Sequence, residues 1–385
     1  MEVALEEDFL FTEVVKNTSN AVIVTDLERK IVFVNKAFTD ITGYTSQEVQ
    51  GRSPSILQGP ETNERTLQRI KMKLESFERV NETVLNYTKS GEKYWIDLDI
   101  YPFLDDLGKP KHYMAIQNVV TEMKSKEILV KEQAKRIKEN ISYAKTLQNS
   151  LFRDTERQLG MFSDLFILDN PKDEVGGDFY ILEEYQNQSV VLVGDCTGHG
   201  VSGAIMTALC ISVATELLAR YKTLSPAMIL NKANEKIAQL IKDSSTHVND
   251  GMEATLLFID KSRKTIRYAT SKQQDIYLSN GDDHLNVFKS VRQKVEHLQS
   301  YELLDGQIEY QSGQMLYLSS DGLKDQIGGD RNKRLGSKKF VEILESMMNT
   351  EVGEQENLIR SSIAQWKGLA NEQTDDILMI GIRLE

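Results

Sequence analysis

The sequence predicts an α+β protein with more than one domain. The chain has 385 residues, more than the ~150 residues of a typical single domain. Short β-rich runs alternate with helical patterns on both sides of residues 122–151, and this segment is rich in Lys and Glu and has no Gly or Pro. We therefore expect an N-terminal domain at residues 9–121, a helical linker at 122–151 and a C-terminal domain at 152–385.

The composition is that of an acidic globular protein. Lys and Arg number 46 against 58 for Asp and Glu, a net charge of -12, which argues against nucleic-acid or anionic-membrane partners. The two cysteines, Cys196 and Cys210, leave no disulfide framework or cysteine-based zinc site. Met1–Asp8 does not have the pattern of a signal peptide, and the longest uncharged run, Val201–Thr215, is shorter than the ~20 residues of a membrane span. We expect a cytoplasmic protein.

The N-terminal domain has the pattern of a small antiparallel sheet with helices. Two β-rich runs, 21–26 and 31–35, flank a charged turn and predict a hairpin. The other expected elements are helices near 37–41 and 61–77 and strands near 79–87, 93–101 and 112–120.

In the linker, apolar residues recur at alternating spacings of four and three, as in a heptad seam. The seam consists of Val130, Ala134, Ile137, Ile141, Ala144 and Leu151, with Gln148 in the one gap. Two interpretations remain open. The segment forms a two-stranded coiled coil, or it is an amphipathic helix packed on its own domain.

Strands and helices alternate in the C-terminal half. The expected strands are 190–194, 254–260, 265–270, 315–319 and 377–382. The expected helices are 203–221, 226–242, 337–348 and 354–366.

Four motifs in this half place aspartate beside glycine or at the end of a strand. Aspartates gathered at one edge of a sheet would repel one another unless cations were present. Oxygen ligands without His or Cys favour Mg²⁺ or Mn²⁺. Taken singly, each motif also suits an ordinary turn, so the argument depends on the set. The motifs are Val175-Gly176-Gly177-Asp178, Gly194-Asp195-Cys196-Thr197-Gly198-His199-Gly200, Ser320-Asp321-Gly322 and Asp375-Asp376-Ile377.

The glycines at 198, 200 and 203 also match Gly-x-Gly-x-x-Gly, a dinucleotide-binding pattern. That interpretation needs a following strand that ends in an acidic residue ~20 positions later. Two successive helices are expected here instead, so an NAD(P)-dependent oxidoreductase is disfavoured.

Residues 140–385 resemble the PPM family of metal-dependent protein phosphatases, in the bacterial branch related to the stage II sporulation protein E phosphatase. The resemblance implies a β-sandwich flanked by helices. It also implies two Mn²⁺ or Mg²⁺ ions, held by Asp178, Asp195, Asp321 and Asp375 and by the backbone carbonyl of Cys196. Asp376 is a weaker alternative to Asp375. Besides the four motifs, the resemblance rests on Ile141-Ser142-Tyr143-Ala144-x-x-Leu147-Gln148 and Asp250-Gly251-Met252-Glu253.

This resemblance implies hydrolysis of phosphoserine or phosphothreonine by a metal-activated water. For this branch the implied substrate is a phosphorylated anti-sigma factor antagonist of the STAS type. Cys196 is then not needed as a nucleophile, and His199 is expected as a turn residue or a support behind the ligands. The competing hypothesis is a catalytically silent scaffold that binds a signalling partner.

Residues 32–51 resemble a PAS domain, and 51–62 with 86–91 are similar to its flavin-binding blue-light (LOV) subgroup. That similarity makes Gln58, Asn86 and Gln117 candidate ligands of FMN. Pro54 stands where the subgroup has its photoactive cysteine, so no thiol adduct can form. Bound flavin, another small ligand and an empty dimerisation module all remain open. We expect a homodimer in which this domain regulates the phosphatase.

Overall fold

A computed structural model describes residues 13–105, 107–151, 160–185, 188–221, 225–242, 252–271, 274–281, 283–295 and 300–385. Two compact units divide inside one helix, the first ending at Arg136 and the second beginning at Ile137. Among the described residues, one helix, Gly200–Arg220, is long and apolar enough to cross a membrane by length and composition, and 50% of its apolar window is buried in the protein.

The first unit is built on a five-stranded antiparallel sheet in the order β2-β1-β5-β4-β3. The strands are β1 (Ala21–Thr25), β2 (Ile31–Val34), β3 (Val80–Tyr87), β4 (Lys93–Leu104) and β5 (Pro110–Val119). All five strands predicted in this domain are confirmed. β4 and β5 run longer than expected because they pair along nearly their full length.

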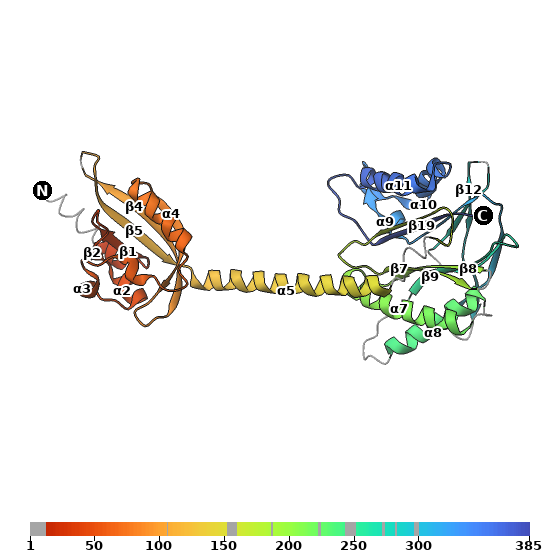
Figure 1. The fold of residues 1–385 in the computed structure, drawn as a ribbon, viewed down its shortest axis with the longest axis horizontal. Helices are drawn as coiled ribbons and strands as arrows, with labels where there is room; N and C mark the ends of the chain where they lie inside the picture. The colour runs from red at the N-terminus through yellow and green to blue at the C-terminus, as the bar shows by residue number, and fades with distance from the viewer. Residues whose placement is uncertain are drawn as a thin grey trace. The chain divides into compact units, whose positions relative to one another are not determined.

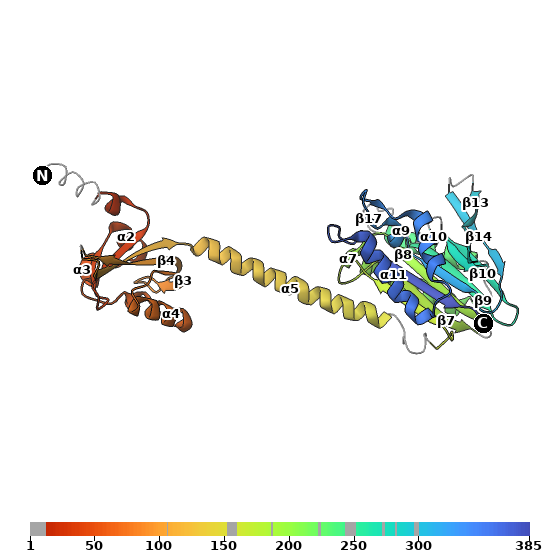
Figure 2. The same cartoon turned by 90° about the horizontal axis from the view of Figure 1, so that it is seen from above.

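Short helices lie between β2 and β3 and close one face of this sheet (Figure 1). They are α2 (Lys36–Thr42), α3 (Ser46–Val49), the 3₁₀ turn η1 (Pro54–Leu57) and α4 (Glu64–Glu75). Asn35 caps α2 by accepting a hydrogen bond from the Phe38 N–H, and Gly43 ends it at φ 76°, a conformation that favours glycine. Phe38 is buried with Ile23 and Leu57 in the core under these helices. α4 lies beside β3 (Figure 2).

One helix, α5 (Thr121–Leu151), covers the whole predicted linker. Val130 and Ile137, two residues of the predicted seam, are 61% and 58% exposed. Ile141 and Ala144 are partly buried and Gln148 is buried. Packing on its own domain therefore accounts for Ile141, Ala144 and Gln148, whereas Leu151 and the middle of the helix remain exposed.

The second unit is a sandwich of two five-stranded sheets, β15-β10-β9-β8-β7 and β12-β11-β16-β19-β6. Val191 and Leu257 of the first sheet meet Leu318 and Ile380 of the second in a shared core. The strands of the first sheet are β7 (Asp178–Tyr185), β8 (Gln188–Cys196), β9 (Met252–Asp260), β10 (Thr265–Thr270) and β15 (Gly306–Glu309). Those of the second are β6 (Leu165–Asn170), β11 (Ile276–Ser279), β12 (Leu285–Phe288), β16 (Met315–Ser319) and β19 (Ile377–Arg383).

Two helices cover the outer face of each sheet (Figure 1). α7 (Gly200–Arg220) and α8 (Pro226–Lys242) pack on the first sheet, and α10 (Gly336–Met347) and α11 (Val352–Lys367) pack on the second. The predicted sandwich flanked by helices is thus confirmed. The smaller elements are the hairpin β13 (Val291–Val295) and β14 (Ser300–Leu304), the short pair β17 (Ile327–Gly328) and β18 (Lys333–Arg334), and α9 (Gly322–Asp325).

Candidate metal centre and candidate ligand pocket

The predicted aspartates come from four elements and gather at one end of the sandwich. Asp178 begins β7 and lies directly opposite Asp195 of β8 in the antiparallel register. Asp321 follows β16, and Asp375 precedes β19. The Ser320 hydroxyl donates a hydrogen bond to Asp178 Oδ2 at 2.7 Å, which joins the two sheets at this point.

Asp178 is buried, the other three carboxylates of this acidic cluster are partly buried, and they lie close enough to repel one another. Burial raises the pKa of Asp178 well above its usual range, and the negative charge of Asp195 raises it further. Burial, with repulsion from Asp321 and Asp375, raises the pKa of Asp195 to about 8. Burial and the charge of Asp325 raise the pKa of Asp321. Lys324 lowers the pKa of Asp321 in part, and a bound cation would offset the repulsion that remains among the carboxylates.

Asp376 has a different role from Asp375. Its Oδ2 accepts from the Gly177 N–H at 2.6 Å and its Oδ1 from the Lys172 N–H at 2.7 Å. Burial raises the pKa of Asp376, while these two hydrogen bonds lower it. Both of its oxygens therefore hold backbone, whereas Asp375 Oδ1 accepts one bond, at 2.9 Å, from the Asp376 N–H. This arrangement favours Asp375 over Asp376 as a metal ligand.

A glycine pair brings the backbone close to the cluster. A Cβ on Gly177 would lie 2.5 Å from the Gly198 carbonyl oxygen and 2.9 Å from that of Cys196, so no larger residue fits. The Cys196 N–H donates to the Gly177 carbonyl at 3.2 Å. The Cys196 carbonyl, the predicted backbone ligand, thus lies beside this turn.

The thiol of Cys196 points away from this chemistry. Cys196 is 2% exposed and packs in the core under α7. Its neighbour Cys210 and its burial both raise the pKa of the Cys196 thiol. A thiol held protonated is a poor nucleophile, which agrees with the prediction that it is not needed for catalysis.

The end of α5 also reaches the glycine pair. Gln148 Nε2 donates to the Gly176 carbonyl at 2.7 Å, and the Thr207 hydroxyl donates to the Gly177 carbonyl at 2.7 Å. In the sequence, Gln148 lies in the gap of a heptad seam and at the end of the helix motif that carries the family resemblance, whereas no role is predicted for Thr207. The polar residue at a seam position and its place in that motif were the available signals for Gln148, whereas nothing in the sequence marked Thr207.

The donor set suits a hard divalent cation. It consists of carboxylate and backbone oxygens, as Mg²⁺ and Mn²⁺ prefer, and Glu253 lies opposite Asp195 in the β8–β9 register. Within the described parts of the chain, no three Asp, Glu, His or Cys side chains already stand at the spacing of metal ligands. Asp250 and Gly251 of the predicted motif lie outside the described residues.

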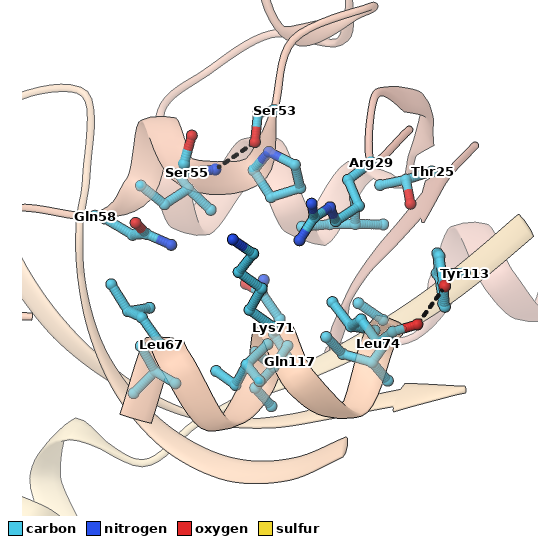
Figure 3. Close-up of a pocket in the computed structure, with 18 of the residues that line it drawn as sticks. Thr25, Arg29, Ser53, Ser55, Gln58, Leu67, Lys71, Leu74, Tyr113 and Gln117 are labelled. Atoms are coloured by element: carbon cyan, nitrogen blue, oxygen red, sulfur yellow. Dashed lines mark hydrogen bonds between the residues drawn. The ribbon is translucent and has the colours of Figure 1, made fainter. Parts of the chain in front are cut away.

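The first unit contains a cavity of about 390 Å³ between its sheet and helices (Figure 3), within the ~300–1,000 Å³ of small-molecule sites. Gln58, Asn86 and Gln117, the three predicted ligand-binding residues, all line it. Gln117 is 3% exposed, and its Oε1 has no hydrogen-bond partner among the described residues. A buried amide oxygen without a partner is unfavourable, and a polar ligand would satisfy it.

Charged residues of both signs also line the cavity, namely Glu28, Arg29, Lys30 and Lys71. The side chains of Arg29 and Lys71 point into it (Figure 3). Pro54, which stands where the LOV subgroup has cysteine, begins η1 and also lines the cavity. Ile96 is fully buried in the core of the sheet.

A stage II sporulation protein E family model matches residues 186–385, about half of the chain. The chain belongs to the stage II sporulation protein E family. A PAS domain model matches residues 19–122, so the predicted combination of a PAS domain and a phosphatase domain of this family is confirmed. In solved structures, the chain is similar to the SiaA-PP2C domain of Pseudomonas aeruginosa, with a TM-score of 0.57 and 28% identity over 66% of this chain and 98% of that one.

The PAS domain of this stage II sporulation protein E family member is similar to parts of a blue-light-activated histidine kinase and of a phototropin. A blue-light-activated histidine kinase of Rhizobium johnstonii is 37% identical over 117 residues, which are 30% of this chain and 34% of the kinase. Phototropin-2 of Oryza sativa is 32% identical over 90 residues, 23% of this chain and 10% of that protein. This chain therefore spans about a third or less of the length of these relatives.

Proposed function

We propose that the chain is a cytoplasmic, metal-dependent protein serine/threonine phosphatase regulated by its PAS domain. The supporting observation is the convergence of Asp178, Asp195, Asp321 and Asp375 at one end of a sandwich of this family. The substrate in this proposal is a phosphorylated STAS-type anti-sigma factor antagonist. Residues 9–121 would sense a signal, 122–151 transmit it and 152–385 hydrolyse the phosphate ester.

The residues present fit two Mn²⁺ or Mg²⁺ ions, held by the four aspartates and the Cys196 carbonyl. Ions bound there would activate a water as nucleophile and neutralise charge on the phosphoryl group. The protein's own contribution is to position the metal-binding carboxylates. Ser320 orients Asp178, and Asp376 holds the turn that presents Asp178.

The test is hydrolysis of p-nitrophenyl phosphate by the full chain with Mn²⁺, comparing wild type with Asp195→Asn. We expect the substitution to abolish metal-dependent turnover. Asp283→Asn is the matched control, because it makes the same change on an exposed turn. Absence of turnover in folded wild type would contradict the proposal and favour the scaffold that binds a partner without hydrolysis.

We also propose that the PAS cavity binds a small ligand, with FMN as the first candidate. The supporting observation is the unpartnered Gln117 oxygen in a cavity that Asn86 and Gln58 also line. The absorbance spectrum of the purified chain, before and after incubation with FMN, tests this. A flavin spectrum that Gln117→Leu weakens supports FMN. Another bound ligand, or none, favours the alternatives of a different small molecule or a dimerisation module.

We propose, finally, that α5 forms a two-stranded coiled coil in a homodimer. Exposed Val130 and Ile137 support this, because a seam in water is unfavourable without a partner. Light scattering on the full chain should give twice the chain mass. Val130→Lys combined with Ile137→Lys should give the single chain mass, and a monomeric wild type would contradict the coiled coil.

A further inference from the structure

Three polar side chains form a hydrogen-bonded row beside the acidic cluster. Lys172 Nζ lies 3.3 Å from His199 Nε2, and His199 Nδ1 lies 3.0 Å from Asp173 Oδ2. Lys172 and Asp173 follow β6, and His199 is the N-cap residue of α7. His199 and Asp173 have side chains 49% and 52% exposed, so the row faces solvent.

Asp173 sets the orientation of the imidazole. An ionised carboxylate only accepts hydrogen bonds, so Nδ1 carries the proton and Nε2 presents its lone pair to the Lys172 ammonium. The chain makes room for this contact at Gly200, where a Cβ would lie 2.9 Å from Asp173 Oδ2. The positive φ of Gly200, 66°, also favours glycine.

The backbone of Lys172 is tied to the acidic cluster. Its N–H donates to Asp376 Oδ1 at 2.7 Å, and Asp376 Oδ2 accepts from the Gly177 N–H, next to Asp178. The base of the lysine side chain is thus held by the same carboxylate that holds the turn before the first candidate metal ligand.

The charge of Lys172 has no acidic partner in this arrangement. Among the described residues no carboxylate oxygen lies within 4.0 Å of its Nζ, although aspartates surround the site. An ammonium has three N–H donors, and His199 accepts from one of them. The others are available to an anion that enters the site.

We propose that Lys172 binds an oxygen of the substrate's phosphoryl group, with His199 and Asp173 as positioning residues. This inference rests on the proposed phosphatase function, which brings a phosphoryl group to the acidic cluster. A lysine held at the rim adds a charge-assisted hydrogen bond to that group. The row of Asp173 and His199 reduces the freedom that a long side chain would lose on binding.

The test uses the full chain with Mn²⁺ and p-nitrophenyl phosphate. A contact made equally in the bound substrate and the transition state affects KM and not kcat. We expect Lys172→Gln to raise KM about tenfold and to weaken competitive inhibition by inorganic phosphate to a similar extent, with kcat changed less than about threefold. Lys172→Arg should restore KM, because it keeps the charge.

His199→Ala should raise KM by a smaller factor, about threefold, because Lys172 keeps its charge and loses its support. The matched control is Lys236→Ala, a lysine whose ion-pair partner is Glu216 on the outer helices. Its KM should equal that of wild type. Equal melting temperatures across the set exclude misfolding as the cause.

Unchanged KM and phosphate inhibition in Lys172→Gln would overturn the inference. A change confined to phosphoprotein substrates would overturn it as well, because Lys172 would then contact the partner's polypeptide. If wild type shows no turnover, the phosphatase proposal fails first. Calorimetric titration of inorganic phosphate with Mn²⁺ then decides the role of Lys172, since equal dissociation constants for wild type and Lys172→Gln refute it and a tenfold gap supports it.

Discussion

In the PAS domain polar side chains line an open cavity, whereas in the phosphatase domain acidic side chains are packed against one another. In the cavity, the Gln117 amide oxygen has no hydrogen-bond partner among the described residues. The acidic cluster is packed, and its imbalance is electrostatic, with the pKa of Asp195 raised to about 8. The first region has a buried acceptor without a hydrogen-bond partner among the described residues, and the second has carboxylates that repel one another. The comparison teaches that each region indicates the class of its ligand through the kind of interaction it is missing.

The largest effect is expected from a substitution in the acidic cluster. Asp178→Asn should lower metal-dependent kcat at least about 10³-fold, because a metal ligand that stabilises the transition state is worth several kcal/mol. The same variant should melt at or above the wild-type temperature in EDTA, because it removes a buried, repelled charge. Activity assays and melting curves on one preparation measure both. A variant that loses activity and also unfolds without metal would refute the electrostatic account.

Metal-free stability should depend on pH in a direction that the cluster sets. The pKa of Asp195 is about 8 in the folded chain and ~3.9 in the unfolded chain, so the folded state binds more protons between these values. Stability is therefore present at low pH and lost as pH rises towards 8. In EDTA we expect the phosphatase domain to melt ~5 °C lower or more at pH 8 than at pH 5.

Saturating Mg²⁺ should remove most of this slope, since the cation replaces the protons. Asp195→Asn in EDTA should reduce the slope as well. A slope that is the same with and without Mg²⁺ would place the titrating groups elsewhere in the chain.

A smaller effect is expected in the PAS cavity. Gln117→Leu removes the unpartnered amide and should raise the free energy of unfolding of the ligand-free PAS domain by about 1 kcal/mol. Asn118→Leu, on the exposed face of the same strand, is the control and should give no such gain. Denaturant unfolding measures both, and destabilisation by Gln117→Leu in ligand-free protein would mean that the amide already has its partners.

The sequence predicted the helices and strands of both regions better than it predicted the contacts between them. The aspartate motifs carried the family signal, and β10, β16 and α8 begin and end where expected. β7 was not predicted, because Asp178–Tyr185 mixes three acidic residues into a short run without clear alternation. The hydrogen bond from Ser320 to Asp178 spans 142 residues and depends on how two sheets stack. The cavity volume likewise depends on packing, which residue patterns do not record.

The smallest effect concerns the helix end that touches the acidic cluster. Gln148→Ala removes the donor to the Gly176 carbonyl, and the Thr207 hydroxyl at 3.3 Å from the same oxygen remains as a weaker partner. Loss of one of the two hydrogen bonds to this buried carbonyl should cost about 1 kcal/mol. If the turn positions Asp178 for catalysis, the same energy corresponds to a fall in kcat of about fivefold. Asn149→Ala, one residue further along α5 and exposed, should leave kcat unchanged. Equal kcat for the Gln148 variant and wild type would show that α5 packs against the turn without setting the position of the carboxylates. Another part of the chain would then have to couple the PAS domain to the acidic cluster.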